Sequence, residues 1–431
     1  MTIVQSIRAD GTPAADRSWL RDALVLLVLT AAMLTRDRSW VVHPALWAED
    51  GMVWFKDVYD HGLAALFMPH AGYQNLYQHL IAMLGLALPL AWLPGWFLVG
   101  GAIAQMLPVA VLLHRGAEIV PSPWARAALI LFYVGIPNSQ EIHLNLTNTQ
   151  WHLSLVLFLL LVLTPPAGWL GRAAHYTGLM VSALTGPFSI FLAPVALWRG
   201  LRPPADRRRE ERLKAALVCA VALVQVVYVV WGLLTVARET LPLGVGFTRL
   251  ARMLADQLFL AGILGARTIW DLRDLPLWRQ SVVAWVVVPL ALAMLAMAFR
   301  RGPAVFRQFL AFGVLTLAAG LVAPVGPSGV EQWGMMDLPG IYGRYFFLPM
   351  MVWFTGLVVL AAQGGTWLRW VALLLLPLCL IGVCRDWLYQ PKQDVHEAYR
   401  QAVRDFEAAP PGTTIKFPEA SPGWTMDLTK R

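Results

Sequence analysis

Long apolar stretches alternate with short polar segments along almost the whole chain. The apolar stretches cover residues 23–35, 76–93, 96–113, 125–137, 151–164, 176–198, 214–236, 281–299, 304–323, 346–362 and 367–384. Several are shorter than the roughly 20 residues of a perpendicular membrane-spanning helix. Short or broken spans are tolerated where their ends face protein or a water-filled cavity. The pattern predicts an all-α fold, a polytopic transmembrane helical bundle of about 11 spans, with residues 76–93 and 254–270 ambiguous.

The composition supports a chain surrounded by membrane lipids. Hydrophobic residues make up 58% of the sequence and charged residues only 14%, whereas soluble domains are typically about 25% charged. The 20 Trp, 18 Phe and 10 Tyr residues suit a protein that is anchored at two membrane–water interfaces. Cys219, Cys379 and Cys384 are too few for a disulfide framework, and we interpret them as lipid-facing or core residues.

We attribute the net charge of +8 to the positive-inside rule for membrane proteins and not to nucleic-acid binding. The basic residues occur in short clusters between apolar stretches, as the positive-inside rule expects of cytoplasmic loops. The clusters assigned to the cytoplasm contain Arg115, Arg126, Arg172, residues 199–212, Arg300, Arg301 and Arg369. The segments that flank residues 176–198 are then both cytoplasmic. This stretch must therefore enter the membrane from the cytoplasm and return to it. Its Gly186–Pro187 break suits the apex of a helical hairpin.

The predicted side of the membrane at each end of every apolar stretch divides the chain into three parts. We expect a disordered cytoplasmic N-terminus (1–18), a transmembrane domain (19–384) and a periplasmic C-terminal tail (385–431) that packs back on the membrane domain. The first apolar stretch is interpreted as a retained anchor, because no convincing signal-peptide cleavage site follows it. The outer, periplasmic segments of the membrane domain are a long first loop (37–75) and residues 138–150, 237–280 and 324–345.

Adjacent carboxylates in the first outer loop, Glu49 and Asp50, form the first candidate site. Such a pair can bind a cation, or one member can act as a general base while the other holds position. The alternative is an acidic N-cap for a helix that begins near Met52. Further along, His70, Tyr73 and Asn75 lie in a stretch crowded with hydrogen-bonding side chains, which suits a polar ligand.

The second outer loop is rich in amides. Its candidate binding residues are Glu141, Asn145, Asn148, Gln150, Trp151 and His152. Desolvated amides are costly unless they are paired, and amides with aromatic rings are also what proteins use to hold sugars. Helix capping together with an interfacial Trp belt is the alternative interpretation.

An arginine stands at the outer mouth of a span, in the sequence Tyr342–Gly343–Arg344–Tyr345. This position runs against the positive-inside tendency, so Arg344 needs a partner. A phosphate or carboxylate suits the bidentate geometry of guanidinium. Snorkelling to lipid head groups is the alternative, and Glu331 and Asp337 are alternative internal partners.

Several catalytic and transport signatures are missing from the sequence. It contains no P-loop, GxSxG, HExxH or GxGxxG motif and no repeat. The central spans also lack the Asp, Glu and Lys residues that mark many ion-coupled transporters.

The order of these motifs resembles the GT-C superfamily of polytopic membrane glycosyltransferases. The shared features are an acidic motif after the first span (EDG at 49–51), PHAGY at 69–73, QWH at 150–152, GRYF at 343–346, PGW at 422–424 and a hairpin that reads GLMVSALTGP at 178–187. The resemblance extends in order over about residues 45–430, closest to bacterial GT-C-like proteins of unassigned substrate. The chain departs from some relatives at the hairpin apex, where Gly186, Pro187 and Phe188 replace a lysine.

The resemblance implies an inverting glycosyltransferase of the bacterial cell inner membrane. It would transfer a hexosyl or pentosyl group from a polyprenyl-phosphate sugar donor to a periplasmic glycan or lipid acceptor in cell-envelope biogenesis. Asp50 would be the general base, Glu49 its support, and Arg344 with Tyr342 and Tyr345 the phosphate contact. Glu49 and Asp50 are also the candidate ligands for a divalent cation, Mg²⁺ or Mn²⁺, if one is needed. A lipid-linked sugar flippase without chemistry and a non-catalytic scaffold are the competing hypotheses.

Overall fold

The fold is mostly helical. A computed structural model of the chain describes residues 18–235, 242–326, 329–363, 365–390 and 392–431. The predicted disordered N-terminus, residues 1–18, therefore lies outside the described residues except for Ser18, which begins the first helix.

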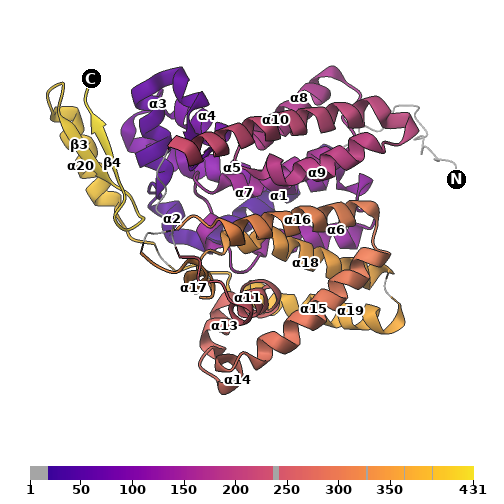
Figure 1. Ribbon diagram of the computed structural model, residues 1–431. Helices are drawn as coiled ribbons and strands as arrows, with labels where there is room; N and C mark the ends of the chain where they lie inside the picture. Colours follow the sequence, from indigo (N-terminus) through magenta and orange to yellow (C-terminus); the bar gives the residue numbers. More distant parts are fainter. Residues whose placement is uncertain (1–17, 236–241, 327–328, 364, 391) are drawn as a thin grey trace, which may run out of the picture.

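The longer helices lie side by side and run between two ends of the molecule (Figure 1). They are α1 (Ser18–Leu34), α5 (Leu93–Arg115), α6 (Pro123–Gly135), α7 (Thr149–Val162), α8 (Trp169–Ala183), α9 (Phe188–Leu201), α10 (Arg208–Thr235), α15 (Val282–Arg301), α16 (Ala304–Val322), α18 (Arg344–Gln363) and α19 (Thr366–Arg385). Shorter helices are α2 (Arg38–Val42), α3 (Lys56–His61), α4 (Leu76–Gly85), α11 (Phe247–Met253), α12 (Ala261–Leu264), α13 (Ala266–Leu272), α14 (Pro276–Arg279), α17 (Gln332–Met336) and α20 (His396–Ala408).

The described residues contain six helices that are long and apolar enough to cross a membrane. These stretches are Leu90–Glu118, Ala205–Thr235, Val282–Arg301, Ala304–Val322, Arg344–Gln363 and Trp367–Arg385, and α6, α7 and α9 are shorter apolar helices. In α18, 89% of the most apolar window is buried, against 17% in α15. Helix α18 is therefore the centre of the bundle, and α15 turns most of its apolar surface outward, as a lipid-facing helix does.

The two ambiguous segments do not form long helices. Residues 76–93 contain the ten-residue α4 and then a break before α5, which is too short to span a bilayer of ~30 Å. Residues 254–270 are divided among a π-helical turn, η8 (Leu254–Phe259), then α12 and α13. Gly265 separates the last two helices with φ +84°, a backbone conformation that glycine adopts readily.

A helical hairpin forms at residues 169–201. The chain reverses between α8 and α9, because Arg172 near the start of α8 and Arg199 near the end of α9 pair with adjacent glutamates, Glu210 and Glu211, of α10. Gly186 has φ +81° at this apex, which accounts for the predicted break there.

The all-α prediction missed two short β-hairpins. Strands β1 (Pro69–His70) and β2 (Tyr73–Gln74) pair antiparallel in the first loop, and β3 (Thr414–Pro418) pairs with β4 (Thr425–Thr429) near the C-terminus. In β3–β4, Phe417, Met426 and Leu428 are buried, so alternate positions form one apolar face. Each strand of β3–β4 is too short for its alternation of apolar and polar residues to be recognised within the polar tail.

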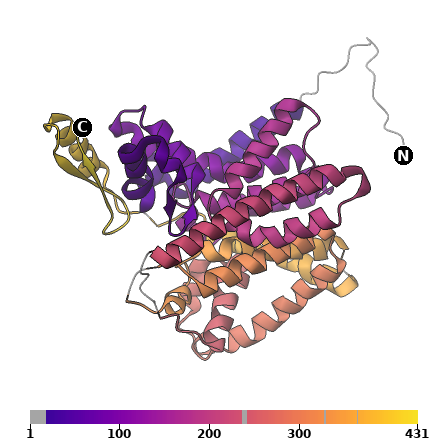
Figure 2. The same cartoon turned by 45° about the horizontal axis from the view of Figure 1, so that its top comes forward.

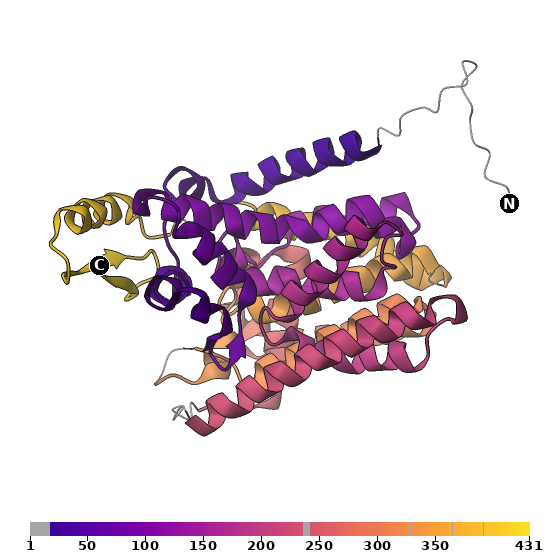
Figure 3. The ribbon, with the colours of Figure 1, turned by 90° about the horizontal axis from the view of Figure 1, so that it is seen from above.

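The C-terminal tail lies against the first loop. Figures 1, 2 and 3 all show α20 and the β3–β4 hairpin beside the helices of residues 38–85. Phe417 packs against Tyr399 and Phe406 of α20, and the same apolar cluster includes Trp54 and Phe55 of the first loop. The tail and the first loop thus share one core, which also includes Phe97 of α5 and Leu153 of α7.

The polar segments gather at the same end of the bundle, which we call the tail end. The tail, the first loop, residues 138–150, residues 242–281 and residues 323–343 are joined there by hydrogen bonds. The opposite end, which we call the arginine end, holds ion pairs from Arg172 to Glu210 (2.9 Å) and from Arg199 to Glu211 (2.8 Å). The predicted separation of basic loops from amide-rich loops therefore corresponds to two physical ends of the molecule.

Candidate functional site

Asp50 is enclosed between the first loop and residues 138–150. Its carboxylate accepts hydrogen bonds from the N–H of Trp47 (3.1 Å) and from the N–H (2.8 Å) and hydroxyl (2.7 Å) of Thr147. The residue is 1% exposed, and burial raises the pKa of its carboxyl group to about 7. Asp50 holds the two loops together, and this geometry does not favour the predicted role of a base that contacts an acceptor.

Asp50 also does not cap the helical turn that follows it. The first orphan N–H groups of that turn, η2 (Asp50–Phe55), are those of Gly51 and Met52, and both point to Glu419 of the tail (3.5 and 2.9 Å). Burial raises the pKa of Glu419 to about 9, and Asp50 and Glu49 add to this rise. The tail therefore supplies the carboxylate that the capping interpretation assigned to the first loop.

Glu49, the other member of the acidic pair, is more accessible. It is partly buried, and among the described residues only its own backbone N–H bonds its carboxylate. Burial raises the pKa of Glu49, Arg344 lowers it and Glu141 raises it. Three residues from distant parts of the sequence are thus close enough for their charges to interact.

Arg344 is held in place by Glu141. The two side chains form an ion pair, and the N–H of Arg344 also donates to the Glu141 carboxylate (3.3 Å). The guanidinium group donates to the carbonyl of Val325 (2.5 Å) and lies 5.0 Å from the ring centres of Tyr342 and Tyr345. A cation at this distance from two aromatic rings is stabilised by both.

The alternative partners considered for Arg344 are engaged elsewhere. Glu331 pairs with Arg249 (2.9 Å) and Asp337 pairs with Arg252. Of the described carboxylates, Glu141 is the one that pairs with Arg344.

Tyr73 and Gln150 complete this group. The hydroxyl of Tyr73 bonds the Gln150 side chain, and burial raises the pKa of Tyr73 to about 12. Trp151 packs edge-on against Tyr345 at 5.5 Å. The Oε1 atom of Gln150 and the Nε1 atom of Trp151 are buried without hydrogen-bond partners in the described structure. Buried polar atoms are rarely unpaired, so these two atoms leave hydrogen-bonding capacity unused within the group.

We refer to this group as the carboxylate–arginine cluster. Its members are Glu49, Tyr73, Glu141, Gln150, Trp151, Tyr342, Arg344 and Tyr345. All eight were predicted as site residues from the sequence, and they come from the first loop, residues 138–151 and the start of α18.

Three other predicted binding residues build the second loop instead. Asn145 and Asn148 bond each other (3.0 Å), and both donate to the carbonyl of Glu141 (2.9 and 3.0 Å). His152 contacts the Tyr133 hydroxyl (2.8 Å) through Nδ1 and the carbonyl of Ile142 (2.9 Å) through Nε2. These three side chains are at most 4% exposed, so they position the loop and do not favour direct contact with a ligand.

The first-loop residues Asn75 and His70 have a similar role. Asn75 donates to the carbonyl of Tyr73 (3.2 Å) and is 1% exposed. His70 packs edge-on against Trp54 at 5.1 Å, and burial lowers its pKa. Both side chains shape the β1–β2 hairpin that presents Tyr73.

The predicted cation site is not built by these residues. The described residues include no group of three His, Cys, Asp or Glu side chains that could hold a metal ion. Asp50 already accepts three hydrogen bonds, so Glu49 and Asp50 do not fit a Mg²⁺ or Mn²⁺ site, which needs about six oxygen ligands.

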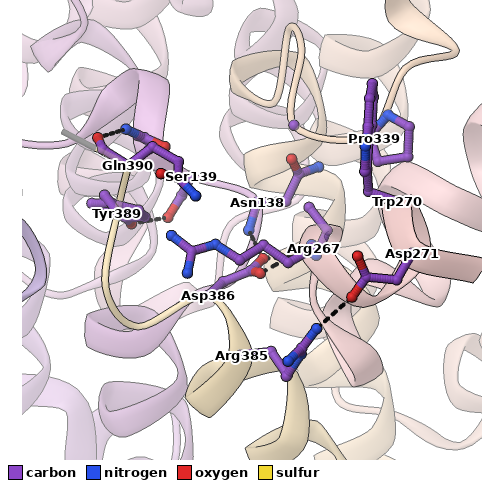
Figure 4. Close-up of a pocket in the computed structure, with 13 residues that line it drawn as sticks. Asn138, Ser139, Arg267, Trp270, Asp271, Pro339, Arg385, Asp386, Tyr389 and Gln390 are labelled. Atoms are coloured by element: carbon purple, nitrogen blue, oxygen red, sulfur yellow. Dashed lines mark hydrogen bonds and ion pairs between the residues drawn. The ribbon is translucent and has the colours of Figure 1, made fainter. Parts of the chain in front are cut away.

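A cavity of about 370 Å³ lies beside the cluster at the tail end. Its walls come from residues 138–140, from α13, from residues 339–340 and from the end of α19 with the start of the tail. Figure 4 shows the side chains of Trp270 and Asp271 on one side of it and Tyr389 and Gln390 on the other, with the Arg267 side chain extending between them. These residues were not predicted from the sequence. Arg385 could have been found, since it is an arginine at a predicted outer end, as is Arg344.

Asp386 fixes the floor of this cavity. Its carboxylate accepts the N–H groups of Asn138 (3.0 Å), Ala266 (2.7 Å) and Arg267 (3.2 Å), which joins three distant segments (Figure 4). Beneath it, the buried guanidinium of Arg36 lies 4.5 Å from the ring centre of Tyr389.

Comparisons of the chain with protein-family models, with curated proteins and with solved structures found no match. The resemblance to GT-C enzymes therefore stays a prediction, and the function is argued from the site itself.

Proposed function

We propose that this protein is a membrane glycosyltransferase that transfers a sugar from a polyprenyl-phosphate donor to an extracytoplasmic acceptor. The observation that carries the proposal is the carboxylate–arginine cluster: the partly buried carboxylate of Glu49, whose pKa burial raises, beside a guanidinium group and unpaired polar atoms. The chemistry of glycosyl transfer requires a group that accepts a proton and a group that stabilises a leaving phosphate.

Glu49 is the general base in this proposal, and Asp50 is a positioning residue. Glu49 takes the proton of the acceptor hydroxyl while the acceptor oxygen bonds to the anomeric carbon of the sugar. The bond from that carbon to the phosphate oxygen breaks, and its electron pair leaves with the polyprenyl phosphate. Attack opposite the leaving group inverts the anomeric configuration. Burial raises the pKa of Glu49 above its ordinary value of 4.5. This rise suits a general base, which works best when its pKa is close to the working pH.

Arg344 stabilises the leaving phosphate. It stands at the end of the central helix α18, where a lipid phosphate in the outer leaflet can reach it. Glu141 orients the guanidinium before the donor binds, and the rings of Tyr342 and Tyr345 border the same group. Tyr73, Gln150 and Trp151 then line the place of the sugar.

The proposal places the tail end on the periplasmic side of a bacterial inner membrane. The basic loops of the arginine end would be cytoplasmic. With α1, α6, α7, α8 and α9 added to the six long apolar stretches, the described residues would form 11 spans.

The first experiment compares purified wild-type protein with the variants Glu49→Gln and Asp50→Asn. Each is reconstituted with a panel of polyprenyl-phosphate sugars, and the lipids are followed by mass spectrometry. Wild type should consume one donor, and Glu49→Gln should do so about 100-fold more slowly with donor binding retained, because only base catalysis is lost. Asp50→Asn should mainly lower the unfolding temperature.

Glu407→Gln is the matched control, since Glu407 is an exposed glutamate of the tail and should behave as wild type. Equal rates for Glu49→Gln and wild type would remove Glu49 from the mechanism.

A carrier for lipid-linked sugars is the second candidate, and the broken hairpin at Gly186 is the feature that suits it. If wild type leaves every donor intact but moves one across a vesicle membrane, the carrier function replaces glycosyl transfer.

A further inference from the structure

The cavity beside the carboxylate–arginine cluster contains a guanidinium group without a carboxylate partner, that of Arg267. Two carboxylates and two guanidinium groups line it. Asp271 pairs with Arg385 (2.6 Å), and Asp386 is occupied by three backbone N–H groups. Arg267 donates to the carbonyl of Leu388, but no carboxylate of the described structure forms an ion pair with it. Its charge is therefore available to an anion.

The same wall carries an exposed aromatic ring. Trp270 follows Arg267 by three residues on α13, so the two side chains lie on one face of the helix, and Figure 4 shows both at the cavity. The Trp270 side chain is 52% exposed. Tyr389, in contrast, is partly buried, bonds Ser139 through its hydroxyl and has Arg36 against its ring. Arg273 lies 5.7 Å from the centre of the Trp270 ring, so the other face of this exposed ring is the one that remains for stacking.

Neutral hydrogen-bonding groups face the aromatic wall. Asn138, Gln140 and Gln390 place amides at the cavity. Nδ2 of Asn138 donates to Gln257 and Nε2 of Gln140 donates to the carbonyl of Gln390, whereas Oδ1 of Asn138 is buried without a partner in the described residues. Asn138 is only 7% exposed. Since an unpaired buried acceptor is costly, it indicates that a hydroxyl or amine donor completes this site.

We infer that this cavity binds an anionic sugar, a pyranose that carries a carboxylate or phosphate group. Arg267 binds the anion, Trp270 stacks on the ring and the amides contact the hydroxyls. The volume of about 370 Å³ falls in the range of roughly 300–1,000 Å³ that small-molecule sites occupy.

This sugar belongs to the acceptor, an inference that rests on the proposed glycosyl transfer. Gln140 lines the cavity, and the next residue, Glu141, pairs with Arg344. The cavity and the carboxylate–arginine cluster thus meet at two consecutive residues of the second loop, so an acceptor anchored in the cavity would extend its next sugar towards Glu49.

Binding of four probes to the full-length protein in lipid nanodiscs tests the inference. The probes are methyl glucuronide, glucose 6-phosphate, neutral methyl glucoside and inorganic phosphate, measured by calorimetry. At least one anionic sugar should bind at least about 10-fold more tightly than both the glucoside and inorganic phosphate, because charge and ring act together. Which anionic sugar binds more tightly identifies the acid group.

Two variants locate the binding site. Arg267→Gln should weaken the anionic sugar about 10-fold and leave the glucoside unchanged, and Trp270→Ala should weaken both sugars. Arg369→Gln, an exposed arginine at the opposite end, is the matched control and should bind as wild type. A glucoside that binds as tightly as the charged sugars, inorganic phosphate that binds as tightly as they do, or no binding of any sugar at millimolar concentration would overturn the inference.

A kinetic measurement separates this inference from the proposed function. In the transfer assay, Arg267→Gln should raise the KM for an anionic acceptor about 10-fold with little change in kcat. If transfer occurs and this KM does not change, the acceptor site is elsewhere and the proposed function stands. If no donor is consumed, the proposed function fails, and the probe binding still decides whether the cavity takes an anionic sugar.

Discussion

At the scale of single residues, burial separates two neighbouring carboxylates. Glu49 and Asp50 are adjacent in sequence, yet Asp50 is enclosed by Trp47 and Thr147 while Glu49 is only partly buried. The sequence predicts both carboxylates as site residues. It cannot assign the two roles, because these depend on which side chain the distant Thr147 reaches.

A third carboxylate, Glu419, leads to a prediction of pH-dependent stability. Its folded-state pKa of about 9 is above its ordinary value of 4.5, so the folded protein binds the proton more strongly than the unfolded chain. The stabilisation is complete below pH 4.5 and is lost as the pH rises towards 9. Wild-type unfolding temperature should therefore fall between pH 6 and pH 9, and Glu419→Gln should show a smaller fall.

The matched control for this measurement is Glu407→Gln, which removes an exposed carboxylate from the same tail. It should keep the wild-type pH profile. A Glu419→Gln profile as steep as that of wild type would mean that Glu419 is ionised in the folded protein.

At the scale of elements, the α8–α9 hairpin is attached to the first loop. The N–H of Gly186 donates to the carbonyl of Gln74 (2.9 Å), and that of Leu76 donates to the carbonyl of Leu184 (3.1 Å). These bonds place the hairpin apex against β2 and next to Gln150. The sequence predicts the break in this stretch, but not the segment that the apex contacts.

Replacement of Gly186 by alanine should destabilise the tail end. The residue has φ +81°, and a Cβ atom there would lie 2.5 Å from Oε1 of Gln150. The backbone strain costs about 1–2 kcal/mol, and the overpacking adds about 1–3 kcal/mol. Gly412→Ala separates the two effects, since Gly412 has φ +87° with open space around it. Denaturant unfolding should rank wild type above Gly412→Ala and Gly412→Ala above Gly186→Ala. Equal losses in the two variants would show that contact with Gln150 is unimportant.

At the scale of the whole molecule, one end differs chemically from the other. Arg172 and Arg199 pair with glutamates at the arginine end, and the tail end carries the cluster, the cavity and the folded tail. The central helix α18 connects the two ends and brings Arg344 to the tail end.

This polarity predicts which end a membrane-impermeant thiol reagent reaches. In a chain whose Cys219, Cys379 and Cys384 are replaced by alanine, a cysteine at Glu407 should be labelled in intact bacterial spheroplasts. A cysteine at Asp206 should be labelled only after permeabilisation, because the positive-inside rule places its arginine-rich loop in the cytoplasm. Both positions are exposed, so access to the reagent depends on the membrane alone. The reverse pattern would place the cluster in the cytoplasm.

The sequence by itself determined the membrane character, the helical hairpin and the residue types of the cluster. The length of each apolar stretch and the charges beside it predict these features, because they decide by themselves whether a segment is more stable in lipid or in water. Only the tertiary structure decided that Asp50 is enclosed, that Asn145, Asn148 and His152 hold their own loop, and that Glu419 reaches the first loop. It also decided the cavity around Arg267, whose walls come from segments more than a hundred residues apart. Such contacts depend on how the helices pack, which a local pattern of apolar and polar positions does not encode.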